Sequence, residues 1–374
     1  MKKLTAPKLI VGSSNNCADV FYATGFKVPD PIVLLAVGRR RYLVVPEMEW
    51  GRAHAECAGF NIFTPERLRL RRNQRRRLSW WAVGLLRTLG VRRVAVPGNF
   101  PLAVARKLEQ RRVRVAVVEG PFFPSRQVKS AGEIKKLHDV QEATVRAMRE
   151  AVAAIAEARV GAQGYLRQGN AILTSERLRT SINKRLLDDQ CAGGEPIVAC
   201  GAEAADPHAV GHGPLRQGEP IVIDIFPQHL ETGYWGDLTR TVVKGVPQAK
   251  IAGMYRAVRA AQNAALRSIR PGVQGAQVHR LVEQEFERRG FPKETINEQP
   301  AGFIHGTGHG IGLEVHEAPS LGKSDQILRA GNVVTVEPGL YYPGVGGVRV
   351  EDAVVVTPRG FSYLAQCEKD LVVR

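Results

Sequence analysis

One glycine-rich stretch of the chain carries a concentrated set of side chains that could do chemistry. It spans residues 304–319, reads IHGTGHGIGLEVHEAP, and places His305, His309 and His316 within twelve residues. Imidazoles at this density are typical of metal or proton-transfer sites. Each glycine costs about 1 kcal/mol relative to alanine inside a helix, so we do not expect a helix with two ligand histidines one turn apart. The alternative is an imidazole-rich surface loop.

Four acidic residues interrupt segments that are otherwise apolar or strand-like. They are Asp224 in EPIVIDIFPQ, Asp237 at the start of DLTRT, Glu337 after VVTV, and Glu351 in VRVEDAVVV. A buried carboxylate without a partner costs several kcal/mol, so each of these needs a hydrogen-bonding group or a cation. The alternatives are a turn aspartate for Asp237 and a buried ion pair with Arg349 for Glu351.

The four carboxylates and the His309 imidazole could hold cations if the fold brings them together. Four negative charges in one pocket would repel one another, and two divalent ions would neutralise them. Oxygen-rich ligands suit ions such as Mn²⁺ better than a closed structural Zn²⁺ site. Two ions about 4 Å apart can activate a water between them. The spacing along the chain does not by itself establish this convergence.

Length and composition predict a two-domain globular protein. The chain has 374 residues, of which 44% are hydrophobic and 24% charged. Its five dispersed cysteines indicate reduced thiols in a cytoplasmic protein. No apolar run approaches the roughly 18 residues of a membrane span, so we expect no membrane partner. The segment GPFFP at residues 120–124 ends the first domain, and we therefore predict domains at 1–125 and 126–374.

Positive charge is concentrated in the first domain. Residues 1–125 contain 23 Lys and Arg against 8 Asp and Glu, a net charge of +15 out of +17 for the whole chain. Most of the excess lies in Arg39–Arg41, Arg67–Arg77 and Arg87–Arg114. A nucleic-acid surface is one interpretation. We expect instead a solvated arginine face without a nucleic-acid partner, because basic runs alone are weak evidence and the segment offers no stacking aromatics beyond Trp80 and Trp81.

The alternation of apolar and polar residues predicts the elements that would position these side chains. In the first domain we expect a small α/β fold, with strands and turns over 8–48 and helices at 79–90 and 101–112. In the second domain a long helix should begin at the capping box Ser130–Glu133. Further helices are expected at about 175–190, 248–270 and 274–289, and strand-rich blocks at 196–246 and 303–373.

Five motifs, taken in order, resemble the creatinase/methionine-aminopeptidase superfamily of pita-bread metallopeptidases, and within it aminopeptidase P and prolidase. They are the pair Pro207-His208 and the stretches DIFPQHLETGYWGDLTRT, HGTGHGIGLEVHEAP, TVEPGLYYP and GGVRVEDAVVV. Together they span essentially all of 126–374. The resemblance implies an α+β pita-bread catalytic domain. It also implies a smaller creatinase-like α/β domain in front of it.

The same resemblance implies a ligand set for two divalent metals. Asp224 would bind one ion, and Asp237 and Glu351 would bridge both. His309 and Glu337 would bind the second ion. Glu337 would also act as the base toward a bridging water. The metals would most readily be manganese, with cobalt or zinc as alternatives.

Four further residues receive roles from the resemblance. His208 and His316 would contact the scissile peptide and stabilise the oxyanion, and His305 would line the proline side of the pocket. Arg349 would orient a ligand carboxylate, a support that metal sites generally need.

The implied activity is removal of the N-terminal residue from peptides with proline second, by attack of a hydroxide that bridges the metals. An Xaa–Pro dipeptidase (prolidase) is the alternative among enzymes, and the resemblance also implies a homodimer. A methionine aminopeptidase is disfavoured by the N-terminal domain, and creatinase by the complete ligand set. A nucleic-acid-binding pseudo-peptidase is the non-enzymatic alternative, and the intact ligand set argues against it.

Overall fold

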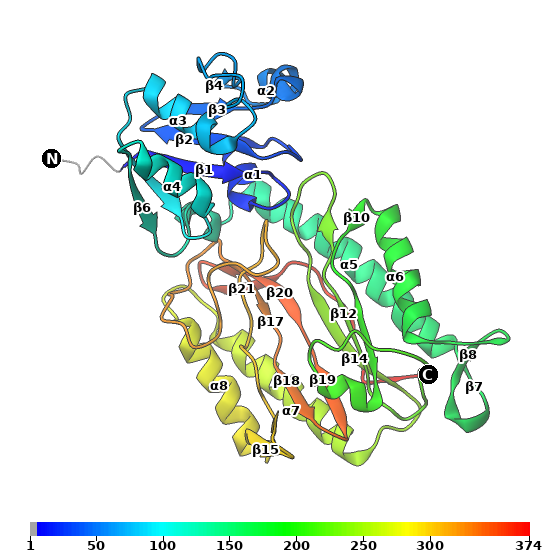
Figure 1. Ribbon diagram of the computed structural model, residues 1–374. Coiled ribbons are helices and arrows are strands. Elements are labelled where there is room, and N and C mark those ends of the chain that lie inside the picture. Colours follow the sequence, from blue (N-terminus) through cyan, green and yellow to red (C-terminus); the bar gives the residue numbers. More distant parts are fainter. Residues whose placement is uncertain (1–5) are drawn as a thin grey trace. The chain divides into compact units, whose positions relative to one another are not determined.

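The computed structural model describes residues 6–374, which form two compact units (Figure 1). Unit 1 ends at Arg126, and unit 2 spans Gln127–Arg374. Each unit is built around its own clusters of buried apolar side chains. Across the described residues, no helix has both the length and the apolar character that a bilayer crossing requires. All five cysteines are free thiols, as predicted.

Unit 1 is a mixed six-stranded sheet with helices on both faces. The strand order is β4-β3-β2-β1-β5-β6. The strands are β1 (Lys8–Gly12), β2 (Ile32–Val37), β3 (Arg40–Val44), β4 (Phe60–Phe63), β5 (Arg93–Pro97) and β6 (Arg114–Val118). The helices are α1 (Ala18–Thr24), α2 (Trp50–Glu56), α3 (Leu78–Thr88) and α4 (Leu102–Gln110). Side chains alternate across the sheet, so Ile10 packs with α1 and α2, whereas Leu9 and Val11 pack with α3 and α4.

The predicted α/β character of the first unit is confirmed, with one local error. The structure places helix α1 inside the segment 8–48, where the sequence predicts only strands and turns. This helix has seven residues and ends at Gly25 in the left-handed conformation, with φ of 68°. Two turns are too short to display an apolar stripe, and glycine adopts a positive φ at no steric cost.

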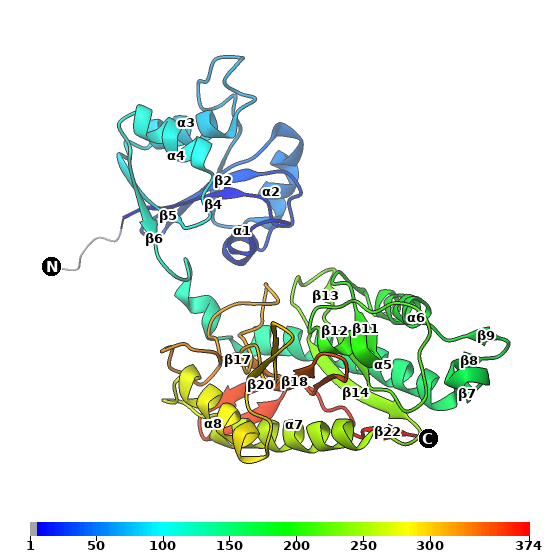
Figure 2. The same ribbon diagram turned by 60° about the horizontal axis from the view of Figure 1, so that its bottom comes forward.

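Unit 2 contains four long helices in two pairs. They are α5 (Ala131–Glu157) with α6 (Ser175–Asp188), and α7 (Ala249–Ser268) with α8 (Gly275–Arg288). The predicted capping box is confirmed: the Ser130 hydroxyl accepts from the Glu133 backbone N–H, and the Ser130 N–H donates to the Glu133 carboxylate at 2.9 Å. Figures 1 and 2 show the two helix pairs on opposite sides of the strands. Helix α5 contacts β12 and β14, and α7 contacts β17, β18 and β19.

The strands of unit 2 lie between the helix pairs. One sheet has the order β11 (Ile197–Cys200), β12 (Ile221–Ile225), β14 (Leu238–Lys244) and β22 (Val372–Val373). The other half contains β17 (Val333–Val336), β20 (Asp352–Thr357) and β21 (Gly360–Tyr363), beside the hairpin β18 (Gly339–Tyr342) and β19 (Gly346–Arg349). The halves meet where the Glu351 N–H donates to the Thr239 carbonyl at 3.0 Å. Short strands complete the unit: β7 (Arg159–Val160), β8 (Leu166–Gln168), β9 (Ala171–Ile172), β10 (Cys191–Ala192), β13 (Gln228–His229), β15 (Glu294–Ile296) and β16 (Gln299–Ala301).

The prediction of a strand-rich block over 303–373 is wrong for its first thirty residues. Regular strands begin only at Val333, and residues 303–332 run as a loop with isolated bridges such as Gly310 to Val334. The loop follows β17 at close range. A backbone that approaches another backbone this closely needs glycines, and those glycines lower strand propensity.

Candidate metal centre

One cavity of about 480 Å³ in unit 2 is lined by every candidate site residue predicted from the sequence. Its lining includes His208, Asp224, Asp237, His305, His309, His316, Glu337, Arg349 and Glu351. The cavity lies where the strands of the two halves meet. Residues from widely separated parts of the chain therefore converge, which the spacing along the sequence could not establish.

Two of the carboxylates come from the β12–β14 pair. Asp224 is the fourth residue of β12 and lies opposite Thr239 of β14 in register. Asp237 immediately precedes β14, and period two places it on the same face as Thr239. Its backbone is held by Gln141 of α5, whose side chain donates to the Asp237 carbonyl at 2.8 Å and accepts from its N–H at 3.0 Å. The interpretation of Asp237 as a turn residue is therefore not needed.

The other two carboxylates come from the second half. Glu337 follows β17 directly, and its N–H donates to the Thr307 carbonyl at 2.8 Å. Glu351 lies between β19 and β20, where its Oε2 accepts from the Thr239 hydroxyl at 2.7 Å. Thr239 therefore links a carboxylate of the second half to the strand that carries the first pair.

His309 is set into the centre by the glycine-rich loop. Its N–H donates to the Thr335 hydroxyl at 3.1 Å, and its carbonyl accepts from the Thr335 N–H at 2.8 Å. The ring Nε2 then lies 3.3 Å from Glu337 Oε1 and 3.6 Å from Asp237 Oδ2. This placement depends on Gly308, because a Cβ there would lie 2.0 Å from the Thr335 carbonyl oxygen.

The Gly308→Ala substitution should therefore destabilise unit 2 by about 2 kcal/mol or more, since overpacking against a fixed backbone typically costs 1–3 kcal/mol. Gly306→Ala is the matched control, because the nearest atom to its Cβ lies 3.6 Å away, an ordinary contact. Calorimetry of both variants would measure the difference. Equal melting temperatures would show that the loop can move away from β17.

Electrostatics in the cavity follow from burial and from crowding of like charges. Burial, followed by the charges of neighbouring carboxylates, raises the pKa of Asp237 and of Glu351 well above the ordinary range. Burial opposes charging of His309, but the hydrogen bond and charge of Glu337, together with the charge of Asp237, outweigh that effect and raise the pKa of His309 to about 9. Burial likewise opposes charging of Glu337, but the hydrogen bond and charge of His309, together with the charges of His305 and Arg349, lower the pKa of Glu337 to about 2.

The donor set fits divalent cations. One ligand atom each from Asp237, His309 and Glu351 lie within 4.8 Å of one another. Within the described residues, Asp224 Oδ1 and Glu351 Oε1 are buried and have no hydrogen-bond partner. Buried carboxylate oxygens without a donor are costly, and a cation is the group that would satisfy them.

Arg349 is paired with Asp224 and not with Glu351. Its Nη2 lies 2.7 Å from Asp224 Oδ2, and its Nη1 donates to the Tyr341 hydroxyl at 2.8 Å. Its Nε donates to the Thr239 hydroxyl at 3.1 Å. The guanidinium is therefore positioned to fix the orientation of Asp224 and leave that residue's other oxygen facing the cavity.

Three further histidines line the same cavity. His305 lies 3.0 Å from the Tyr341 hydroxyl, and burial lowers its pKa. His316 stands edge-on to His309, with ring centroids 4.2 Å apart, and partial burial together with the charge of His309 lowers its pKa. His208 is solvent-exposed, and its N–H donates to Asp206 at 2.9 Å. Imidazoles with lowered pKa values are neutral near pH 7 and can both donate and accept hydrogen bonds.

A buried ionic network that no sequence pattern predicted supports the backbone of Glu351. Arg240, which is 2% exposed, donates to the carbonyl oxygens of Thr239 and Glu351 at 2.9 and 2.5 Å. It also pairs with Asp352 at 2.8 Å, and Lys369 pairs with the same carboxylate at 2.5 Å. Two further carbonyls accept from Arg240, those of Cys367 and Glu368.

Sequence reasoning missed several residues that shape the centre. Gln141, Thr239 and Tyr341 hold its ligands or its arginine by hydrogen bonds. Gln141 could have been noticed as a polar residue four positions after Leu137, on the apolar face of α5, where the structure leaves it 1% exposed. Tyr341 lies inside the motif TVEPGLYYP, in which the resemblance implies a role for Glu337 alone. The pairing of Arg240 with Asp352 depends on which strands lie side by side, so no local pattern reveals it.

The fold and the carboxylate-lined cavity define a candidate metal site of the metallohydrolase type, and comparison with known proteins identifies the family. A profile described as metallopeptidase family M24 matches residues 135–358. The chain belongs to this family, which confirms the resemblance seen in the sequence.

Curated relatives are named as dipeptidases and peptidases. The chain is 36% identical over 182 residues to an Xaa-Pro dipeptidase of Pyrococcus horikoshii, covering 48% of each chain. It is 38% identical over 182 residues to the probable dipeptidase PepE of Mycobacterium tuberculosis, covering 47% of this chain and 45% of that protein. The alignments thus span about half the length of the curated relatives.

Solved structures resemble nearly the whole chain. The prolidase from Pyrococcus horikoshii matches with a TM-score of 0.80 and 25% identity over 98% of this chain and 95% of that one. An X-Pro aminopeptidase from Thermotoga maritima also has a TM-score of 0.80 and 25% identity, over 98% and 97%. The expected fold, a catalytic unit preceded by an N-terminal α/β unit, is therefore confirmed.

Proposed function

We propose that this protein is a metal-dependent peptidase that hydrolyses the bond between an N-terminal residue and a following proline, with Xaa–Pro dipeptides as its substrates. The observation that carries the proposal is the group of Asp237, His309 and Glu351, whose ligand atoms lie within 4.8 Å of one another in the cavity. The relatives named as Xaa-Pro dipeptidases support the substrate class and favour it over the aminopeptidase activity expected first from sequence.

In this proposal Asp224 would help to hold one divalent ion, His309 and Glu337 would help to hold the other, and Asp237 and Glu351 would serve both. When bound, such ions polarise a carbonyl and lower the pKa of a water. Manganese is the first candidate, with cobalt or zinc as alternatives, because four of the five ligands are carboxylates. The cytoplasmic location and the homodimer expected from sequence stay predictions.

The remaining residues supply proton transfer and orientation. Glu337, with a pKa of about 2, is ionised near neutral pH and can accept a proton from an attacking water. The same carboxyl can return that proton to the proline nitrogen, which leaves poorly until it is protonated. His316, whose pKa is lowered, can donate an N–H group to the developing oxyanion, and His208, which faces the same cavity, can contribute a second donor. His305 lines the proline side of the pocket in this proposal.

A second candidate is an aminopeptidase acting on longer peptides, and one observation favours it. Among the described lining residues, the single arginine or lysine is Arg349, which is already paired with Asp224 at 2.7 Å. The free carboxylate of a dipeptide would therefore find no unengaged guanidinium or ammonium group in the cavity. An uncharged or extended C-terminal side of the substrate would not require one.

The test is hydrolysis of an Xaa–Pro dipeptide, its C-terminal amide and an Xaa–Pro–Yaa tripeptide by the protein loaded with Mn²⁺, Co²⁺ or Zn²⁺. A higher kcat/KM for the free dipeptide supports the dipeptidase, and a higher value for the amide and tripeptide supports the second candidate. Cleavage that continues after chelation, or equal cleavage of an Xaa–Ala control, would exclude both.

The His316→Ala substitution should lower kcat by about a hundredfold, the effect typical of removing one donor to an oxyanion. The bound metal content should stay unchanged, because His316 is outside the proposed ligand set. The exposed His212, which does not line the cavity, provides the control variant His212→Ala. Metal loss in the His316 variant would make that residue a ligand and refute its proposed role.

A further inference from the structure

The topology of unit 1 places the starts of several strands at the same end of its sheet. Strand β1 is parallel to β5, and β5 is parallel to β6. Strand β2 is antiparallel to both β1 and β3, so β3 also runs in the direction of β1. The first residues of β3, β5 and β6 consequently lie along one edge of the sheet, the edge formed by the ends of the strands and not by an outer strand.

Three arginine runs that are distant in sequence meet at this edge. Arg39–Arg41 form the turn from β2 and the beginning of β3, where Arg40 is opposite Val37. Arg92 precedes β5 and Arg93 begins it, and Arg111–Arg114 run from the end of α4 into the first residue of β6. Arg93 and Arg114 are direct partners in the parallel register. Like charges placed opposite each other on neighbouring strands are destabilising.

A fourth run joins them through helix α3. Arg87, in the last turn of α3, donates to the Leu68 carbonyl at 3.0 Å, which places the loop 67–77 against this helix. The link from α3 to β5 is short, so the end of α3 lies at the same edge as the start of β5. We define the arginine surface as Arg39–Arg41, Arg67–Arg77, Arg87–Arg93 and Arg111–Arg114.

The charges of the arginine surface are not compensated by unit 1 itself. The four runs contain sixteen arginines and no lysine, aspartate or glutamate. In the described part of the chain, one of the sixteen has a carboxylate within 4.0 Å: Arg75, which lies 3.9 Å from Glu66. The other fifteen are solvent-exposed. Self-repulsion of this kind is relieved when a polyanion binds.

The chemistry of the surface distinguishes among polyanions. Guanidinium groups bind phosphate through two parallel hydrogen bonds, which lysine cannot do. From β3 to β6 the edge covers four strand spacings, or about 19 Å, a length along which a duplex presents about eleven phosphates. Insertion into a membrane would need apolar side chains among the basic ones. The large exposed apolar residues of unit 1, Met48, Leu102 and Val117, lie outside the four runs.

We propose that the arginine surface binds the phosphate backbone of a double-stranded nucleic acid without reading its base sequence. This replaces the expectation from sequence, where the runs are separate and a solvated face was the simpler interpretation. It is independent of the peptidase proposal, because the two concern different units.

The experiment is fluorescence anisotropy of the full chain with a labelled 20-base-pair DNA duplex and the matching RNA duplex, over a range of salt concentrations. The test variant is Arg39→Gln/Arg93→Gln/Arg114→Gln, with one substitution from each of three runs. The control variant is Arg256→Gln/Arg267→Gln/Arg280→Gln. It removes the same charge from exposed positions on α7 and α8.

We expect the unmodified chain to bind with an affinity that falls steeply as salt rises. The test variant should bind at least about tenfold more weakly and lose about three units of the slope of log K against log salt, one for each phosphate contact. The control should bind within about twofold of the unmodified chain. Comparison of the two duplexes shows whether DNA or RNA is preferred.

Three results would overturn the proposal. The first is no binding by the unmodified chain at 50 mM salt, and the second is an equal loss of binding in the test and control variants. The third comes from a parallel measurement with anionic lipid vesicles, if the test variant loses binding to the vesicles but not to either duplex. Thermal unfolding of unit 1 in the test variant checks its integrity. We expect its melting temperature to stay the same or rise, because like charges have been removed. If the melting temperature of the test variant is substantially lower, the titration would be repeated with a variant that carries Arg40→Gln in place of Arg39→Gln.

Discussion

Replacing Glu351 by glutamine should stabilise the metal-free protein and weaken metal binding at the same time. In the absence of metal, burial and three neighbouring acidic groups raise the pKa of Glu351, so its ionised form is disfavoured in the folded state. Glutamine keeps an oxygen that can accept from the Thr239 hydroxyl and carries no charge. We expect the melting temperature of unit 2 to rise by about 2 °C or more, equivalent to about 1 kcal/mol.

The sign of the accompanying pH effect follows from linkage. A carboxyl whose pKa is raised in the folded state binds more protons there than in the unfolded state. The metal-free chain should therefore lose stability as the pH rises above the ordinary glutamate pKa of about 4.3. The Glu351→Gln variant should lose less over the same range, which calorimetry at several pH values would measure.

With metal present the order should reverse. The variant has lost a negatively charged ligand atom, so we expect its affinity for Mn²⁺ to fall at least about a hundredfold, beyond the loss typical of supporting residues. Equilibrium dialysis with metal analysis would measure this. The exposed Glu287 on α8 provides the control Glu287→Gln, which should change neither quantity. Undiminished Mn²⁺ affinity in the Glu351 variant would remove this residue from the metal centre.

The Asp352→Asn substitution should destabilise unit 2 by about 3–5 kcal/mol, the cost typical of removing one partner from a buried ion pair. Asp352 is 1% exposed and pairs with both the buried Arg240 and the half-buried Lys369, so its loss leaves both cations without this counter-charge. The amide can accept hydrogen bonds but cannot neutralise either cation. Calorimetry should show a lower melting temperature for unit 2, with unit 1 unaffected.

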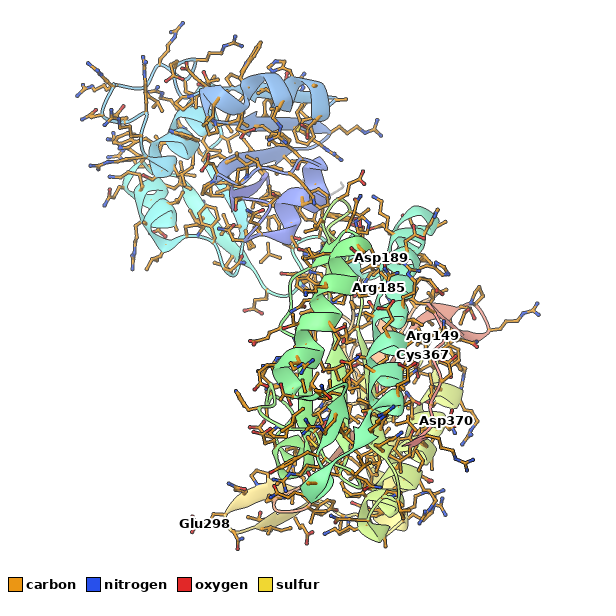
Figure 3. All side chains as sticks on the ribbon, turned by 90° about the vertical axis from the view of Figure 1, so that its right-hand side faces the viewer. Arg149, Arg185, Asp189, Glu298, Cys367 and Asp370 are labelled. Carbon is orange, nitrogen blue, oxygen red and sulfur yellow. The ribbon has the colours of Figure 1, made fainter. Side chains whose placement is uncertain are left out.

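A neighbouring pair provides the control for this prediction. Glu368 pairs with Arg149 at 2.9 Å, and both side chains are at least half exposed; Figure 3 shows Arg149 close to Cys367 in this region. Surface pairs contribute about 0–1 kcal/mol, so Glu368→Gln should have little effect. Similar losses of stability in the two variants would mean that the buried Asp352 pairs contribute no more to the stability of unit 2 than the exposed pair does.

The sequence predicted the residues that line the cavity better than it predicted the residues that support them. Carboxylates that interrupt apolar strands are visible locally, because burial makes them costly, and the capping box of α5 is a pattern of four consecutive residues. Supports such as Gln141, Arg240 and Asp352 act across long sequence separations, so only the arrangement of the elements reveals their partners. Residues 303–332 were predicted to belong to a strand-rich block, but they form a loop. The glycines there serve close backbone approach instead.

The arginine runs illustrate the same limit on the first unit. Each run taken alone is compatible with a solvated face, and the α/β pattern was predicted correctly without any statement about strand order. The order β4-β3-β2-β1-β5-β6 and the strand directions bring the runs together. Sequence patterns give the class of a fold more readily than they give the neighbours within its sheet.

The contact between Arg240 and the carbonyls of Cys367 and Glu368 has a consequence for biosynthesis. During translation, the segment that completes the cage around Arg240 emerges from the ribosome more than a hundred residues after Arg240 itself. Until then Arg240 of β14 lacks two of the carbonyl groups that accept its hydrogen bonds. We expect nascent chains to acquire their ions only after this late segment has docked, so that metal binding does not guide the earlier steps of folding.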